Sequence, residues 1–523
     1  MFDFGLLDFV VLAVIAGLLI YFYYWKQFRY WRNKGVPYAE PEFFFGNFKE
    51  MFFQRKSFAH FIQDLHMQGK GHPLFGFYIF GRPALLLRDP QMIKHVFVKD
   101  FGHFVDRYAK ADFKHDPLGS RNLFMEKGQP WRHMRTKITP VFTSGKMRRM
   151  FPLVTRCGEN LQEYLDEIGA RGTKPVEIRE TMARFATDVI STCAYGVEAN
   201  SMKDKDAEFR KFGRIVFEFD VRRTLEIMVI FFVPAFVKLG LFKFFSPETT
   251  KYLRKVFWEV ITVREKNNIK RNDLIDLLIQ LKNQGRIEDE GVDDNEKSNQ
   301  PISKTSDFTD DDLVAQAAIF FTAGYETNSS TLCFCLYELS GAPDIQQRLR
   351  RDIVDTLERH GGEITYEAMQ EMTYLEKVVS ETLRKYPPVG FLDRVCTKDY
   401  VLPDAGVHVQ KGTPVYVPVH GIHRDPEFYP DPESFDPERF SEQSKQARTP
   451  YTYLSFGEGP HNCIGLRFAQ MTVKTSLVHV LSRYEVRRCS ETPASLEFST
   501  KAIILAATED IKLVFRPLAD GAQ

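Results

Sequence analysis

The stretch "FGEGPHNCIG", residues 456–465, holds a single cysteine among three glycines and a proline, with no second cysteine nearby to form a disulfide or a metal clip. Cys463 lies where a helix is expected to begin, and the free N–H groups and dipole of a helix N-terminus stabilise a thiolate. Gly459 and Gly465 would let the backbone approach a flat partner closely. Such a thiolate suits axial ligation of haem iron, although a lone cysteine in a loop is more often buried and inert.

An acid and an alcohol are neighbours in "AGYET", residues 323–327. They fall inside a predicted helix that begins at Thr309 or Asp310, ends at Gly341, and is apolar on nearly all sides, which indicates a buried central helix. A glycine inside a helix costs about 1 kcal/mol relative to alanine, and a threonine can bend the helix by bonding to the preceding turn. Such a bend can open a niche for a diatomic ligand, with groups that deliver protons. A plain kink in a core is the alternative.

Two further pairs share helix faces. Glu381 and Arg384 in "ETLR" are three residues apart, a spacing that most often produces a surface salt bridge. Trp131 and Arg135 in "WRHMR" are four residues apart. The arginine fork matches a carboxylate, so this second face is a candidate anion site.

The cysteine loop resembles, in every fixed position, the haem-binding signature of the cytochromes P450. The matching residues are Phe456, Gly459, His461, Cys463 and Gly465. The resemblance implies that Cys463 is the axial ligand of the iron, the one metal ligand from the protein, with Phe456 packed beside the sulfur. It also implies that His461 reaches a haem propionate. Many relatives carry arginine there, and histidine would make the contact depend partly on protonation.

The same resemblance assigns the other motifs. Oxygen activation falls to the kinked helix, with the acid–alcohol pair delivering protons, at Ala323, Gly324, Glu326 and Thr327. A structural lock near the haem is formed by Glu381, Arg384 and, from "DPERF", Arg439. The propionates are bound by Trp131 and Arg135, and by arginines from "FVDRY" and "FLDRVC", Arg107 and Arg394. Surface salt bridges are the alternative for the last two arginines.

By position, the resemblance also places a wall of aromatic and aliphatic side chains around the substrate. We expect it to comprise Phe113, Leu118, Leu123, Phe124, Phe320, Phe321, Ala323, Val389, Phe391, Leu392, Ala502 and Ile503. Such a lining suits an apolar guest. Each of these side chains could equally belong to the ordinary core.

The resemblance covers almost the whole chain and implies a mainly α fold, a helical prism around haem with a small β portion. The cofactor would be haem b, with electrons from NADPH through a membrane-bound P450 reductase and cytochrome b5 as a second candidate donor. The reaction would be that of an unspecific monooxygenase, inserting one atom of O2 into a lipophilic small molecule.

The stretches "FTSGKM" and "FLDRVC", and the style of the N-terminus, resemble insect microsomal enzymes of the xenobiotic-metabolising clan. This favours plant toxins and insecticides as substrates. A dedicated hydroxylase or epoxidase in hormone, fatty-acid or pheromone metabolism stays open, as does a protein that binds lipophiles without turnover. An isomerase or synthase needs no proton-delivery pair, so Glu326 and Thr327 weigh against it.

The elements that must position these residues are mostly helical from "WRHMR" onward. Hairpins are expected at 73–89 and 496–515, and a polar, acidic surface linker at 284–310. The expected organisation is a membrane anchor with basic flank at 1–34, a Pro/Gly hinge at 35–45 and a catalytic domain at 46–523.

Residues 9–25, "FVVLAVIAGLLIYFYYW", carry no charge and approach the roughly 20 residues that cross a bilayer. Acidic residues precede this run and basic ones follow it, so the positive-inside rule leaves the body in the cytosol. A cleaved signal peptide would have its basic residues first, and a transit peptide would lack acids. We expect a single-pass anchor in the endoplasmic reticulum membrane. A second apolar stretch, 227–237, is either a core helix end or a loop dipping into the membrane.

Charge and cysteine content exclude other classes. A net charge of +1 provides no field for nucleic acid. Seven cysteines without a C-x-x-C pair favour reduced thiols over a disulfide framework. Basic residues near "WRHMR" form either a solvated face or a docking surface for an acidic electron donor. They are Lys137, Lys146, Arg148 and Arg149.

Overall fold

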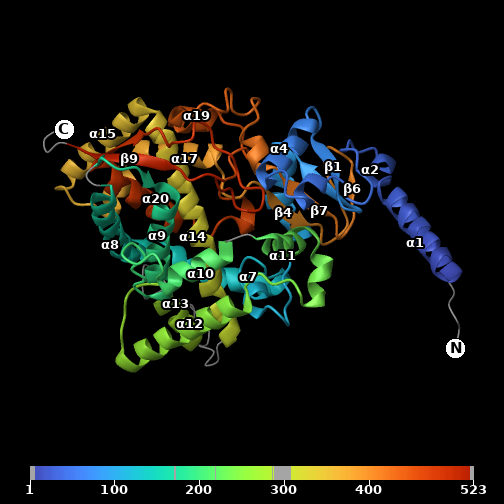
Figure 1. Cartoon of the computed structure of the whole chain (residues 1–523), viewed down its shortest axis with the longest axis horizontal. Helices are drawn as coiled ribbons and strands as arrows, with labels where there is room; N and C mark the ends of the chain where they lie inside the picture. Colours follow the sequence, from blue (N-terminus) through green and yellow to red (C-terminus); the bar gives the residue numbers. More distant parts are fainter. Residues whose placement is uncertain (1–5, 170–171, 218–219, 286, 288–307, 519–523) are drawn as a thin grey trace, which may run out of the picture.

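The computed structural model describes residues 6–169, 172–217, 220–285, 287 and 308–518. Helices dominate it (Figure 1). The longer helices are α1 (Leu6–Gln27), α4 (Phe58–Gln68), α7 (Gly128–Ile138), α8 (Ser144–Ile168), α9 (Ile178–Ile190), α10 (Glu208–Phe217), α11 (Val221–Phe232), α12 (Pro247–Asn267), α13 (Leu274–Gln284), α14 (Asp310–Gly341), α15 (Pro343–Arg359), α17 (Thr373–Lys385) and α20 (Leu466–Leu481). The short helices are α2 (Tyr30–Asn33), α3 (Lys49–Phe52), α5 (Pro90–Lys94), α6 (Pro117–Ser120), α16 (Tyr366–Glu371), α18 (Val419–Ile422) and α19 (Glu442–Ala447).

Helix α14 runs through the middle of the molecule (Figure 1). It contacts α9, α17 and α20, among others, and is buried along most of its length. Its first turn is closed by a capping box in which Thr309 Oγ1 accepts from the Asp312 N–H and Asp312 Oδ2 accepts from the Thr309 N–H. The predicted helix and both of its ends are confirmed.

The first sheet has the order β1–β2–β7–β4. Strands β1 (Leu74–Ile79) and β2 (Arg82–Leu87) form the predicted hairpin at 73–89. Strand β7 (Pro414–Val417) pairs parallel to β2 and antiparallel to β4 (Leu392–Val395), which brings "LDRV" from far along the chain into this sheet.

The predicted hairpin at 496–515 is confirmed only as a short antiparallel pairing near its turn, and its second strand pairs elsewhere. Within the segment Phe498 bridges Ala507, with hydrogen bonds from the Ser499 N–H to the Ala506 carbonyl and from the Thr508 N–H to the Glu497 carbonyl. Strand β9 (Lys512–Pro517) pairs instead with β8 (Tyr484–Arg488) and β3 (Val176–Glu177). In this position β9 buries Leu513 and Phe515 in the core, so long-range burial prevailed over the local turn. The remaining pair of strands is β5 (Tyr400–Val401) with β6 (His408–Val409).

Helix α1 projects from the body (Figure 1) and is exposed along most of its length. Residues Leu7–Gln27 are the one stretch among the described residues that is long and apolar enough to cross a membrane. Trp31, just beyond it, is fully buried and donates from Nε1 to the Phe77 carbonyl at 3.2 Å. The chain therefore packs against the first sheet immediately after the anchor. The boundaries at 34 and 45 stay a prediction.

The apolar stretch 227–237 divides into two parts. The part within α11 packs in the core, with Ile230 fully buried. The following 3₁₀ helix, Pro234–Leu239, leaves Phe236 exposed. The first part is therefore a core helix end, as one of the two interpretations had it. Most of the expected linker lies outside the described residues, at 286 and 288–307.

Candidate functional site

Cys463 lies between a 3₁₀ turn, Gly459–His461, and the start of α20. Its N–H donates to the Phe456 carbonyl at 2.7 Å, which closes the loop, and the Gly465 N–H bonds to the sulfur. The side chain has accessible surface, yet desolvation is the main cause that raises the pKa of its thiol; Arg135 and Arg107 act in the opposite direction. A side chain that lines an internal cavity would combine accessible surface with desolvation in this way.

Two glycines of the loop, Gly459 and Gly465, differ in how closely other atoms approach them. Gly459 has φ +70°, and a Cβ there would collide with the Phe97 carbonyl oxygen. Its bare backbone is therefore required by another part of the chain rather than by a flat ligand. At Gly465 the nearest side-chain atom, from Phe142, would lie 3.9 Å from an added Cβ, which is ordinary contact.

Three guanidinium groups gather beside Cys463 and His461. They belong to Arg107, Arg135 and Arg394, and burial is the main cause that lowers the pKa of each. Arg107 is 3.7 Å from Asp393, while Arg135 bonds to the Asn462 side chain at 2.7 Å.

Among the described residues, one carboxylate, that of Asp393, lies next to these three cations, and it already accepts another hydrogen bond. Asp393 Oδ2 also accepts from the Tyr108 N–H at 2.5 Å. The Nε atoms of Arg107 and Arg394 are buried and find no hydrogen-bond partner in the part of the chain that the structure describes. Such isolation is costly for a charged donor. Two further carboxylates would satisfy the cluster, and haem brings two propionates, so the residues fit this group.

His461 makes a contact that the sequence did not reveal. Its Nε2 donates to the Val105 carbonyl at 2.6 Å, and its ring stacks on Trp131 with centroids 3.7 Å apart. Burial, followed by Arg394, strongly lowers the pKa of the imidazole, which favours a neutral ring with its proton on Nε2. A propionate contact stays a prediction, and it would require protonation against the direction of this shift.

Helix α14 turns one small side chain toward open space. Ala323 is exposed although Thr322 and Tyr325 beside it are buried. Thr327 Oγ1 donates to the Ala323 carbonyl at 2.6 Å, the expected bond to the preceding turn. A Cβ on Gly324 would lie 2.5 Å from Ile190 Cδ1, so this glycine lets α9 approach α14.

Glu326 projects into a different environment. Burial is the largest influence on its pKa and raises it, while Arg179 and Arg210 oppose that shift. Its carboxylate accepts a long bond of 3.5 Å from Ser330 Oγ. The acid and the alcohol are sequence neighbours, and the acid has a raised proton affinity.

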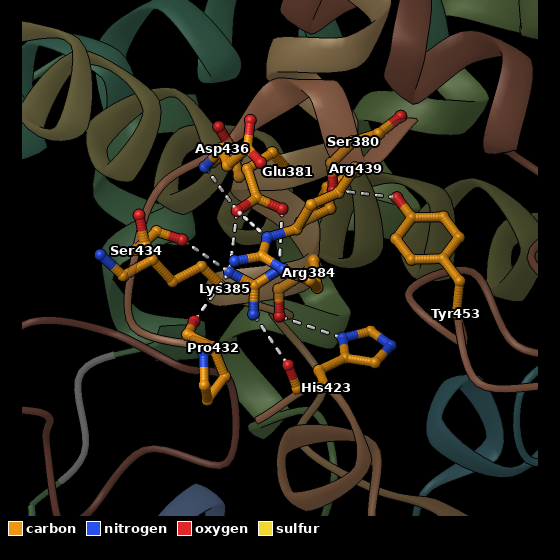
Figure 2. Close-up of polar contacts among 12 residues, drawn as sticks. Ser380, Glu381, Arg384, Lys385, His423, Pro432, Ser434, Asp436, Arg439 and Tyr453 are labelled. Carbon is orange, nitrogen blue, oxygen red and sulfur yellow. Dashed lines mark hydrogen bonds and ion pairs between the residues drawn. The ribbon is translucent and has the colours of Figure 1, made fainter. Parts of the chain in front are cut away.

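Figure 2 shows the Glu381–Arg384 pair, whose two side chains are fully buried. Arg384 Nε and Nη2 bond to the two carboxylate oxygens at 2.7 and 2.8 Å, and Nη1 donates to the His423 carbonyl at 2.8 Å. Arg439 Nε lies 3.6 Å from Glu381 and its Nη2 donates to the Asp431 carbonyl. The pair is thus a buried ion network and not a surface salt bridge.

Among the expected substrate contacts, Phe320 and Phe321 lie on different faces of α14. The Phe320 ring is 5.3 Å from that of Phe142, the side chain that neighbours Gly465. Phe321 is fully buried and packs on Phe209 at 5.7 Å, in the core. Phe321 therefore follows the alternative of ordinary core, and Phe320 faces the cysteine side.

Phe113 is not brought to this region. It is 60% exposed, with the Arg121 guanidinium 4.2 Å from its ring. Arg121 in turn pairs with Asp312 in the first turn of α14, about 16 Å along the helix axis from Ala323. The turn that carries Phe113 is held at that end of the helix.

The other expected contacts are spread over three segments. The ring of Phe124 lies 4.3 Å from the Arg107 guanidinium. Phe391 is buried against Phe232, with centroids 5.5 Å apart. Ala502 is half-buried in a turn closed by Ser499. Their contacts with substrate stay predictions.

The expected basic patch is only partly a surface. Lys146 is buried, Arg148 pairs with Glu367 at 2.7 Å, and Lys137 donates to the Gly285 carbonyl. Sequence patterns did not single out Asn462, which adjoins Cys463 and is the partner of Arg135.

Comparison with known proteins yields matches along nearly the whole chain. The family described as "Cytochrome P450" matches residues 36–515. The chain is 52% identical over 509 residues to cytochrome P450 6k1 of Blattella germanica, covering 96% of each protein. It is 41% identical over 521 residues to probable cytochrome P450 6g2 of Drosophila melanogaster, covering 97% of this chain and 98% of that one. Cytochrome P450 6j1 of Blattella germanica is 39% identical over 515 residues, covering 98% and 99%.

Proposed function

The chain belongs to the cytochrome P450 family, and from this membership we propose that it is an unspecific monooxygenase that oxidises lipophilic xenobiotics such as plant toxins and insecticides. Family membership makes it a haem-thiolate monooxygenase with electrons from NADPH through a reductase, and confirms the mainly α fold with a small β portion. The names of its insect relatives specify no substrate, so the substrate class is our inference.

We propose that Cys463 holds the haem iron and that Arg107, Arg135 and Arg394 receive the propionates, with Trp131 beside them. The single observation that supports this is the excess of buried guanidinium groups next to the cysteine, with two Nε atoms lacking partners among the described residues. Bound haem supplies the activation of O2 through which one oxygen atom enters the substrate and the other leaves as water.

Glu326 and Thr327 form the proposed proton-delivery pair, with Glu326 as the acid and Thr327 as a hydroxyl that holds water beside it. The raised pKa of Glu326 favours its protonated form, which can release a proton, and the two arginines that oppose the shift stabilise the carboxylate that remains. Because Thr327 Oγ1 donates its own proton to the Ala323 carbonyl, its lone pairs are available to accept from water. Ala323 leaves room beside this hydroxyl.

The exposed helix α1 supports a location in the endoplasmic reticulum membrane, with the catalytic domain on the cytosolic face. In this arrangement the reductase is a membrane neighbour, and cytochrome b5 is a second proposed donor. Residues 1–34, 35–45 and 46–523 are the proposed anchor, hinge and catalytic domain.

The test is a titration of the purified full-length protein with a panel of apolar ligands, followed by the haem absorption spectrum. Plant allelochemicals and insecticides stand beside juvenoids, ecdysteroids and fatty acids. Displacement of an iron-bound water shifts the spectrum toward high spin. Shifts from many unrelated compounds, with NADPH-dependent product formation, would support the xenobiotic proposal. A tight shift from one hormone-like compound alone would replace it with a dedicated hydroxylase or epoxidase.

A further inference from the structure

His423 follows the short helix α18 and is fully buried. It exchanges two hydrogen bonds with Arg384: Arg384 Nη1 donates to the His423 carbonyl at 2.8 Å, and His423 Nδ1 donates to the Arg384 carbonyl at 3.1 Å (Figure 2). Arg384 lies in the last turn of α17, whose carbonyl groups have no partner within the helix. The ring therefore caps the helix that carries the buried ion network.

The second ring nitrogen points to another part of the chain. His423 Nε2 accepts from the Leu454 N–H at 2.9 Å. Because a backbone N–H can only donate, Nε2 is unprotonated and the proton resides on Nδ1. Burial lowers the pKa of the ring to about 3, so both bonds belong to a neutral imidazole in one tautomer.

Leu454 lies two residues before the cysteine loop, 456–465, and is bonded to it. Its carbonyl accepts from the Gly457 N–H at 2.9 Å, and the Phe456 carbonyl accepts from the Cys463 N–H at 2.7 Å. A continuous series of short contacts thus runs from the end of α17, through one imidazole, to the cysteine.

The neighbours of Leu454 also dock on α17, but by side chains. Tyr453 Oη donates to the Ser380 carbonyl and Ser455 Oγ to the Leu383 carbonyl. The Tyr453 ring stacks on His423 with centroids 5.6 Å apart. Among the described contacts of residues 453–455 with α17 and His423, the bond from Leu454 is made by a backbone N–H, and the others are made by side chains. The Leu454 bond therefore fixes the register of the loop directly.

We propose that His423 is a positioning residue for Cys463: its imidazole sets the distance between the end of α17 and the start of the cysteine loop, and thereby the placement of the sulfur. This inference rests on the proposed role of Cys463 as the haem ligand. It assigns to His423 an effect on the iron–sulfur bond in addition to any effect on folding.

Two amide variants separate the two ring contacts. In His423→Asn the amide nitrogen occupies the place of Nδ1, which keeps the donor to the Arg384 carbonyl and removes the acceptor for Leu454. In His423→Gln the amide oxygen reaches the place of Nε2, which keeps that acceptor and removes the donor. Both variants are made in the full-length chain and purified with haem.

The readouts are the haem content, the position of the ferrous carbon monoxide Soret band, which distinguishes a thiolate from a neutral ligand, and the haem reduction potential. We expect His423→Gln to keep the thiolate band. We expect His423→Asn to show a several-fold larger share of the neutral-ligand band and a shifted potential, at similar unfolding temperature. Equal spectra for the two variants, a wild-type spectrum for His423→Asn, or loss of all haem from both would overturn the proposal and leave a structural histidine.

A Cys463→Ser variant separates this inference from the proposed function. Loss of the thiolate band in Cys463→Ser supports Cys463 as the ligand whatever the histidine variants do. If that band persists, the assignment of the ligand is wrong, and the role given to His423 is wrong with it.

Discussion

Replacing Arg384 with alanine tests the buried ion network most severely. The change removes both bonds to Glu381 and the donors to the His423 and Pro432 carbonyls, all between 2.7 and 2.8 Å. It leaves a fully buried carboxylate with Arg439 at 3.6 Å and one N–H donor, from Asp436. Breaking one side of such a pair costs about 3–5 kcal/mol, a large part of the roughly 5–15 kcal/mol that stabilises a domain.

The assay is the ratio of haem to protein in the purified full-length variant, together with its apparent unfolding temperature. We expect Arg384→Ala to be largely apoprotein and to unfold several degrees lower, with Arg384→Lys between it and wild type because lysine keeps the charge but loses the fork.

The matched control is Arg156→Ala, an arginine that is 68% exposed and 3.4 Å from Glu198. Exposed pairs contribute about 0–1 kcal/mol, so this variant should keep its haem. Normal haem content in Arg384→Ala, with an unfolding temperature equal to that of Arg156→Ala, would refute the reasoning.

Arg394→Met keeps side-chain bulk but removes a guanidinium whose buried Nε has no partner among the described residues. Because a charge-assisted bond contributes about 1.5–3 kcal/mol, we expect haem to dissociate about tenfold faster or more. An unchanged rate of haem transfer to a haem-binding acceptor protein would contradict this expectation. Thr327→Val preserves the shape of the side chain but removes the hydroxyl bonded to Ala323. Because general acid–base groups contribute about 10²–10⁴-fold to a rate, the amount of product formed per NADPH consumed should fall about tenfold or more at normal haem content. An unchanged ratio of product to NADPH would argue against a role in proton delivery. Burial raises the pKa of Asp116 to about 6, while its carboxylate accepts from the N–H groups of Gly119 and Phe244. The folded state therefore holds the Asp116 proton more tightly than the unfolded chain does. This tighter binding contributes stability on the order of 3 kcal/mol, at 1.36 kcal/mol per pKa unit. The contribution is lost as the pH rises from about 4 through 6. Asp116→Asn should lose that pH dependence, so its unfolding temperature should rise relative to wild type as the pH increases from about 4 to about 6. A constant difference across this range would show that Asp116 is not the titrating group.

Local patterns in the sequence were sufficient for the elements whose formation is itself local. Helix α14 has the predicted ends because the Thr309–Asp312 capping box and a long apolar run act within the helix. The hairpin at 73–89 formed because its strands adjoin one tight turn. The cysteine motif was readable for a similar reason, since its fixed positions lie within ten residues, 456–465.

Contacts between distant segments decided the rest. Strand β9 left its predicted hairpin for β8, because that pairing buries Leu513 and Phe515. Phe113 lies at the N-terminal end of α14, far from Ala323, because Arg121 packs on its ring and pairs there with Asp312.

The sequence by itself determined which residue types are available for chemistry: one thiol at a helix start, an acid–alcohol pair within a central helix, and scattered arginines. Only the tertiary structure decided which of them meet and in what state of protonation. It gathers Arg107, Arg135 and Arg394 beside His461, and burial there favours the neutral ring that donates to the Val105 carbonyl. The physical reason is that desolvation and the pairing of charges depend on everything that surrounds a group, and those surroundings come from segments hundreds of residues apart.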